Sequence, residues 1–158
     1  MTARSDRFPF DDAFTVAASP QRCWEALSDT DRYTDWWPWL RTLDTEDGLT
    51  PGGSARGVIK APLPYTLTVE IRIGAVVPGR RLDAVIDGDL AGPARLELAE
   101  RSGGTSLHLS WDLELRAAML RRLAVVGRPL MLWGHDRIVR TGFEQFRDRA
   151  LTGTGAGR

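Results

Sequence analysis

Acid–base chemistry on a bound substrate needs side chains that point inward, and His135 and Tyr65 are the two candidates for this in the 158-residue chain. His135 is expected on the apolar face of a C-terminal helix, and Tyr65 on the apolar face of a strand near its end. There the imidazole and the phenol could polarise a carbonyl or move a proton. A lone histidine on an apolar face is also commonly a core residue bonded to a backbone carbonyl, and the Tyr65 hydroxyl could reach water. Both interpretations therefore stay open.

The other reactive groups favour neither metal nor nucleotide chemistry. Cys23 is the single cysteine, so it cannot form an internal disulfide, and with only His108 and His135 available no metal-ligand spacing can be built around it. The 21 positive side chains balance 21 negative ones, which disfavours nucleic-acid binding, and no apolar run reaches the length of a membrane span. We therefore expect a cytoplasmic monomer or homodimer without cofactor, metal, nucleic acid or integral membrane association.

The order of elements predicts one α+β domain. Ser19 as an N-cap and Pro20 in the first turn predict a helix after a strand over residues 12–18, and a second short helical turn follows. From residue 40 the chain shows extended runs separated by glycine and proline, which predicts an antiparallel meander. Its six strands are expected within residues 40–48, 53–62, 65–79, 80–89, 92–104 and 105–116. Pro129 then opens a long amphipathic helix, while residues 117–127 could form a helix or a mobile flap.

Alternation along the strands predicts that the sheet has one apolar face. From Tyr65 to Ile73 the odd positions are apolar and the even ones polar, and the run from Leu107 to Leu115 repeats this division. The acidic side chains of the strands and His108 alternate with the apolar ones. We therefore expect them on the outer face of the sheet: Glu70, Glu97, His108, Asp112 and Glu114. The apolar face needs a cover, and the long C-terminal helix is the element able to lie across it.

Three indoles gather around Pro38, at a position where the proline disfavours helix. Trp36 is expected in the core, and at least one of Trp37 and Trp39 is expected in the wall of an apolar cavity. Trp111, at mid-strand on the apolar parity, is expected to form the cavity floor. The predicted ligand-binding residues are Trp37, Trp39, Tyr65, Leu67, Val69, Leu109, Trp111, Leu132, His135 and Val139.

This order of elements and two segments resemble the helix-grip fold of the SRPBCC superfamily, which includes START domains and birch-pollen allergens. The segment "FTVAASPQRCWEALSDTDRYTDWWPWL" (residues 14–40) looks like the superfamily's opening strand, helix and W-x-P turn. The segment "RPLMLWGHDRIVRTGFEQF" (residues 128–146) is similar to the final helix of bacterial members described as polyketide cyclase/dehydrase or lipid-transport proteins. The resemblance implies a curved antiparallel sheet wrapped around a long C-terminal helix, with two short helices after the first strand.

We expect a single ligand-binding domain over residues 10–151, with a tail at 1–9 and a disordered tail at 152–158. The resemblance implies binding of a small hydrophobic or aromatic molecule, such as a polyketide, lipid or quinone-like compound, in a cavity between sheet and helix. One alternative is a polyketide cyclase or dehydratase, acting through His135 and Tyr65 on a poly-β-keto or aromatic substrate in the same cavity. A second is a protein-interaction module that docks through an apolar surface near residues 117–127. The fold by itself does not choose among them.

Overall fold

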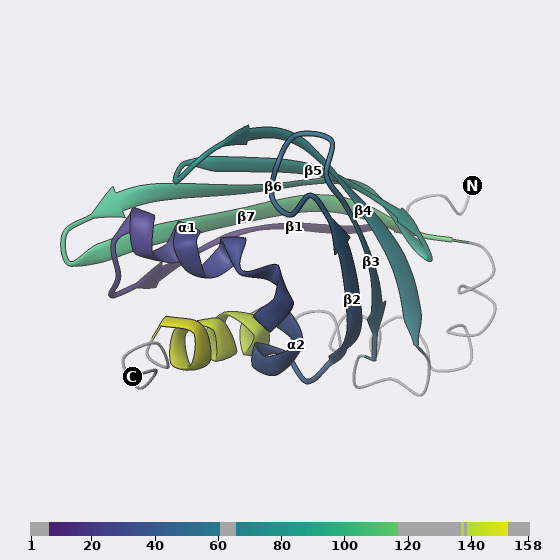
Figure 1. Ribbon diagram of the computed structural model, residues 1–158, viewed down its shortest axis with the longest axis horizontal. Coiled ribbons are helices and arrows are strands. Elements are labelled where there is room, and N and C mark those ends of the chain that lie inside the picture. The colour runs from purple at the N-terminus through teal and green to yellow at the C-terminus, as the bar shows by residue number, and fades with distance from the viewer. Residues whose placement is uncertain (1–6, 61–65, 117–136, 138, 152–158) are drawn as a thin grey trace.

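Seven antiparallel strands form one curved sheet, and the helices lie on its concave side (Figure 1). The computed structural model describes residues 7–60, 66–116, 137 and 139–151. The strands follow the order β1-β7-β6-β5-β4-β3-β2, so that β1 and β2 are the two edges. Their bounds are β1 (Arg7–Val16), β2 (Leu40–Glu46), β3 (Ser54–Ile59), β4 (Leu67–Val77), β5 (Arg81–Gly88), β6 (Leu90–Arg101) and β7 (Gly104–Leu115). This arrangement confirms the predicted α+β helix-grip architecture.

Two short helical elements connect β1 to β2, as the sequence predicts. Helix α1 (Pro20–Ser28) begins at the Ser19 cap, whose hydroxyl accepts a hydrogen bond from the Arg22 N–H over 3.1 Å. A 3-10 turn, η1 (Thr30–Arg32), and the one-turn helix α2 (Tyr33–Trp36) follow it. The cap satisfies a backbone donor that the first helical turn would otherwise leave unpaired. Ser19 and Pro20 therefore act as the sequence indicated.

Glycines close the hairpins of the meander at the predicted reversals. Gly79 between β4 and β5 has φ 76°, and Gly103 between β6 and β7 has φ 83°. Positive φ is the region that side chains with a Cβ rarely adopt, so glycine lets these strands turn sharply. The short connections fix each strand beside its chain neighbour, which gives the meander from β2 to β7.

The alternation of apolar and polar side chains is confirmed in β4 and β7. Val69 and Ile73 in β4 are buried, whereas Glu70 and Arg72 between and beside them are exposed. In β7 Leu107, Leu113 and Leu115 are buried on the same face. The strands pair in register, so these apolar positions line one side of the sheet, the concave side that faces the helices.

The main hydrophobic core lies at one end of the concave side, between the sheet and the helices. It consists of Val16, Cys23, Ala26, Trp36, Leu98, Leu107 and Phe146. Cys23 is fully buried there, which confirms its predicted role as a small core residue. Residues 139–145 are helical and continue into the π-helical segment η2 (Phe146–Leu151), which contacts α1 and α2. The Phe143 ring stacks on Phe14 of β1 at 3.8 Å between centroids, so this helix covers the concave side.

Three predicted strand boundaries are wrong. The first strand begins at Arg7 instead of residue 12, and it ends at Val16 instead of residue 18. The cause is pairing with β7, which runs from Arg7 opposite Glu114 to Val16 opposite Thr105. Strand β6 likewise begins at Leu90, before the predicted residue 92. The segment 117–127, the start of the C-terminal helix at Pro129 and the tail 152–158 lie outside the described residues.

Candidate functional site

The predicted ligand-binding residues of the strands share the concave face. Leu67 and Val69 come from β4, and Leu109 and Trp111 come from β7. Trp111 stacks on Phe10 of β1, with ring centroids 4.9 Å apart. Val139 of the C-terminal helix is buried at 7% exposure. Sheet and helix thus present apolar groups to the same side of the molecule.

Burial along β7 is lowest in the middle of the concave face. Leu107 is 1% exposed and Leu113 is 5% exposed, but Leu109 and Trp111 between them are only half-buried. Their partners across the ladder, Leu96 and Ala94 of β6, are half-buried as well. The concave face is therefore closed at both ends of β7 and partly open at its centre.

Three hydrogen bonds fasten the tryptophan turn to the C-terminal helix. The Trp37 indole N–H donates to the Gly142 carbonyl over 2.8 Å, and the Trp39 indole N–H donates to Gln145 Oε1 over 3.1 Å. In the opposite direction, Arg149 Nη1 donates to the Trp36 carbonyl over 3.0 Å. Each bond joins residues more than 100 positions apart in the chain. We call Trp36, Trp37, Trp39 and these helix partners the indole latch.

The rings of the indole latch also pack on each other and on the helix. Trp37 and Trp39 are stacked with centroids 5.6 Å apart, and Trp36 meets Phe146 edge-on at 5.8 Å. Gly142 lies directly beneath them, because a Cβ built there would be 3.5 Å from Trp39 Cζ2. Trp36 is 3% exposed, which confirms it as a core residue. Trp37 and Trp39 are half-buried, and their contact with a ligand stays a prediction.

The two candidate catalytic residues, His135 and Tyr65, lie outside the described residues, and so does Leu132. The other phenol, Tyr33, is structural: its hydroxyl donates to the Leu27 carbonyl, and burial raises its pKa well above the ordinary value of 10.0. Among the described residues, no group of three or more acidic, histidine or cysteine side chains could hold a metal ion.

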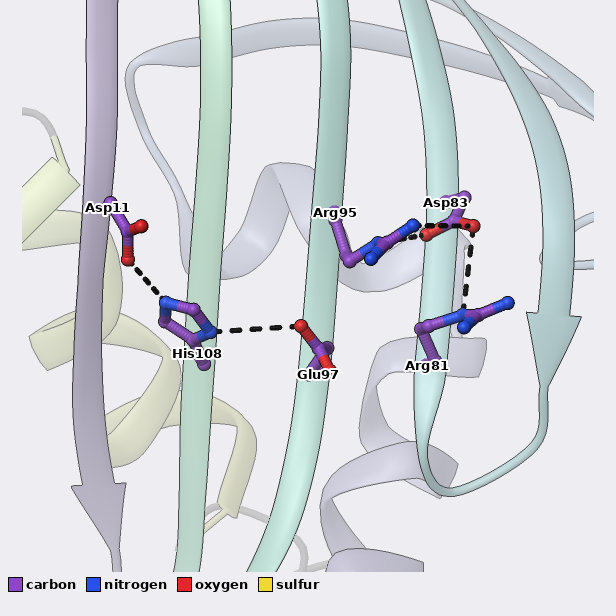
Figure 2. A network of polar contacts seen from close by, with 6 residues as sticks. All are labelled: Asp11, Arg81, Asp83, Arg95, Glu97 and His108. Atoms are coloured by element: carbon purple, nitrogen blue, oxygen red, sulfur yellow. Dashed lines mark hydrogen bonds and ion pairs between the residues drawn. The ribbon is translucent and has the colours of Figure 1, made fainter.

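The polar side chains of the strands lie on the convex face, where charged groups pair across neighbouring strands (Figure 2). His108 Nε2 is bonded to Asp11 of β1, and His108 Nδ1 is 3.8 Å from Glu97 Oε1 of β6. Further along the same face Arg95 Nε donates to Asp83 Oδ1 over 2.7 Å. The hydrogen bond that His108 donates to the Asp11 carboxylate, supported by nearby carboxylates, raises the pKa of His108 above 6.5. These contacts confirm Glu97 and His108 as outer-face residues, and cross-strand pairs with Arg56 and Arg7 do the same for Glu70 and Asp112.

A polar hollow of about 500 Å³ opens elsewhere on the sheet, over β2, β3 and β4. Most of the side chains that line it belong to the outward-facing set of the strands, including Asp44, Glu46, Arg56 and Arg72. Arg56 is already paired with Glu70 over 2.6 Å. Cross-strand charge pairing of this kind is typical of a solvated sheet surface, so this hollow is distinct from the apolar concave site.

Three residues of β1 belong to the concave face but were missed in the sequence. Phe10, Asp12 and Phe14 lie opposite Trp111, Leu109 and Leu107 of β7. The strand was expected to start at residue 12, so its aromatic positions were only partly seen. The run "RFPFDDAFTV" contains the signal, because Phe8, Phe10, Phe14 and Val16 alternate with other residues at a period of two.

Comparison with known proteins identifies the family. Residues 7–153 match the profile of the family described as "Polyketide cyclase / dehydrase and lipid transport". The chain belongs to this family. A search of curated proteins finds no match.

Solved structures of the same fold are similar at low sequence identity. The di-domain aromatase/cyclase StfQ from the steffimycin biosynthetic pathway is 14% identical, with a TM-score of 0.74 over 97% of this chain and 54% of its own. This chain therefore spans about half the length of StfQ. The ZhuI aromatase/cyclase from Streptomyces sp. R1128 is 18% identical, with a TM-score of 0.67 over 92% of both chains. A START superfamily protein from Mycobacterium smegmatis is 15% identical, with a TM-score of 0.69 over 90% of this chain and 96% of its own.

These likenesses establish the START/SRPBCC fold. In the described part of the chain, no helix combines the length and apolarity that crossing a membrane requires.

Because the indoles pack closely on Gly142, small and large substitutions at this position should have opposite effects on stability. Gly142→Ala should raise the free energy of unfolding by up to about 1 kcal/mol, because alanine favours helix and the new Cβ makes an ordinary contact. Gly142→Leu should lower it by about 1–3 kcal/mol, because the longer side chain displaces Trp37 and Trp39. Urea unfolding followed by circular dichroism measures both. Equal stability of the two variants would show that the indoles do not press on this position.

The raised pKa of His108 predicts a pH-dependent stability. The folded state favours the protonated imidazole, so this contribution is fully present below the ordinary value of 6.5 and is lost as the pH rises through the folded-state pKa. The difference in Tm between the wild type and Asp11→Asn should therefore be largest near about pH 5.5 and shrink toward about pH 8.5. Asp44→Asn, on the same convex side but away from His108, should show no such trend. A difference that grows with pH would contradict the proposed pairing.

Proposed function

We propose that the protein binds a small hydrophobic or aromatic molecule, of polyketide, lipid or quinone-like type, against the concave face under the C-terminal helix. The observation that carries this proposal is the burial pattern of β7, where half-buried Leu109 and Trp111 lie between fully buried neighbours. Partly exposed apolar side chains at the centre of an otherwise covered face are typical of a ligand site.

The chemistry of this surface suits an apolar ring system. Trp111 and Phe10 form a stacked aromatic pair, and Leu96 and Leu109 flank them in the adjacent row. Covering such side chains with a ligand contributes about 25 cal/mol per Å² of apolar area removed from water, before the entropic costs of binding. Stacking on the aromatic pair adds a preference for flat, conjugated molecules.

The indole latch supports the proposal from the other side of the site. It holds residues 142–149 of the helix by directed hydrogen bonds. This part of the helix is therefore held on the sheet without close packing of side chains at the centre of the concave face.

Catalysis on a polyketide is the second candidate function, and the family supports it. The family's description includes polyketide cyclases, and StfQ and ZhuI are described as aromatase/cyclases. In this chain the cyclase would use His135 and Tyr65 to polarise carbonyls of a poly-β-keto substrate while the concave surface holds the chain folded.

Binding is tested with the neutral dye Nile red and with native mass spectrometry. The wild type should enhance dye fluorescence, and freshly purified protein should carry a small apolar molecule. Trp111→Ala should weaken dye binding about three- to tenfold, because it removes the aromatic platform. The control is Val85→Ala, at a side chain that is 56% exposed on the convex face. A dye affinity unchanged by Trp111→Ala, or lowered equally by Val85→Ala, contradicts the concave site.

The catalytic alternative predicts loss of turnover on a poly-β-keto substrate. His135→Ala and Tyr65→Phe should each reduce the rate about a hundredfold or more, since each removes a proton-transfer or carbonyl-polarising group. His108→Asn is the matched control, because His108 lies on the convex face and should leave the rate unchanged. Product formation that survives both substitutions at His135 and Tyr65 rules out this chemistry.

A further inference from the structure

Asp12 places a carboxylate on the concave face beside the half-buried centre of β7. Along β1 its neighbours on this face are Phe10 and Phe14, and its partner across the ladder is Leu109. The row continues through Leu96 of β6 to Leu82 of β5. Asp12 is exposed, and Leu109, Leu96 and Leu82 are half-buried. The charged group thus ends the same row of apolar side chains that forms the middle of the proposed site.

The two adjacent acids, Asp11 and Asp12, face opposite sides of the sheet and differ in their partners. Asp11 points to the convex face and is bonded to His108 (Figure 2). Asp12 forms no ion pair with any described residue, and its Oδ1 accepts a hydrogen bond only from the backbone N–H of Ala13, over 2.8 Å. Its charge helps to raise the pKa of His108, but the hydrogen bond to that ring is made by Asp11. A structural role in pairing strands, evident for Asp11, is therefore not shared by Asp12.

An acceptor at this place discriminates among ligands. A molecule lying over Leu109 and reaching the β1 edge would displace water from the carboxylate, which is costly unless the molecule returns a hydrogen bond. A site that holds a charged acceptor therefore rejects analogues that lack a donor much more strongly than a purely apolar site would. It also repels anions placed at the same edge.

We propose that Asp12 is the specificity-determining residue of the concave site and selects apolar or aromatic ligands that carry a hydrogen-bond donor, a hydroxyl or an ammonium group, at one end. The ligand's ring system lies on Phe10, Trp111 and Leu109, and its donor bonds to the Asp12 carboxylate at the β1 edge. This inference rests on the proposed ligand-binding function and adds the orientation and polarity of the ligand.

The test uses three pyrenes that differ in one substituent, with dissociation constants measured by tryptophan quenching at pH 7. The wild type should bind 1-hydroxypyrene about tenfold more tightly than 1-methoxypyrene, which has no donor. Pyrene-1-sulfonate should bind more weakly than either. In Asp12→Leu the hydroxyl preference should fall to about one, and in Asp12→Asn the sulfonate affinity should rise about three- to tenfold.

Asp11→Asn is the matched control, because it changes the neighbouring acid on the other face of the same strand. It should leave all three dissociation constants within about twofold of the wild type. Thermal unfolding of each variant confirms that the fold is retained, as expected at an exposed edge position. Equal wild-type affinity for the hydroxy and methoxy compounds, or a preference that persists in Asp12→Leu, overturns the role of Asp12 while the binding site stands. If no pyrene binds the wild type, the proposed function itself fails, and this inference fails with it.

Discussion

The apolar face of a twisted sheet has to be shielded from water, and this one constraint organises the whole molecule. Seven strands turn their apolar side chains to a single concave side, and chain reversals at glycine keep them in that register. Helices α1 and α2 and the C-terminal helix all lie on this side (Figure 1). The core is solid where α1 and η2 meet β6 and β7, and it becomes looser toward the middle of β7. A ligand site follows from covering a large curved face with few helices.

The indole latch explains how the cover stays in place. Tryptophan combines a large apolar ring with one N–H donor, so Trp37 and Trp39 can pack on the helix and bond to it at the same time. Gly142 permits this approach, because any long side chain there would occupy the space of the rings. The indole-rich turn thus attaches the C-terminal helix to the rest of the domain. The convex face, in contrast, is held by charge pairs such as Arg95 with Asp83.

Local patterns in the sequence predicted the elements, but not the contacts between distant segments. The period of two from Leu107 to Leu115 and the Ser19 cap are local signals, and both are confirmed. The bonds from Trp37 and Trp39 join segments more than 100 residues apart, and alternation or spacing carries no information on such a pairing. Asp12 was missed for a different reason. Which side of the sheet Asp12 faces depends on how β1 pairs with β7, and this pairing begins at Arg7.

Methyl-resolved NMR during titration with 1-hydroxypyrene shows whether a ligand binds on the concave face. Binding there should cause chemical-shift changes and ligand NOEs at Leu67, Val69 and Leu109, with Val77 and Val85 unaffected on the exposed surface of the sheet. Changes confined to Val77 and Val85, or NOEs to them in place of the concave leucines, would contradict it.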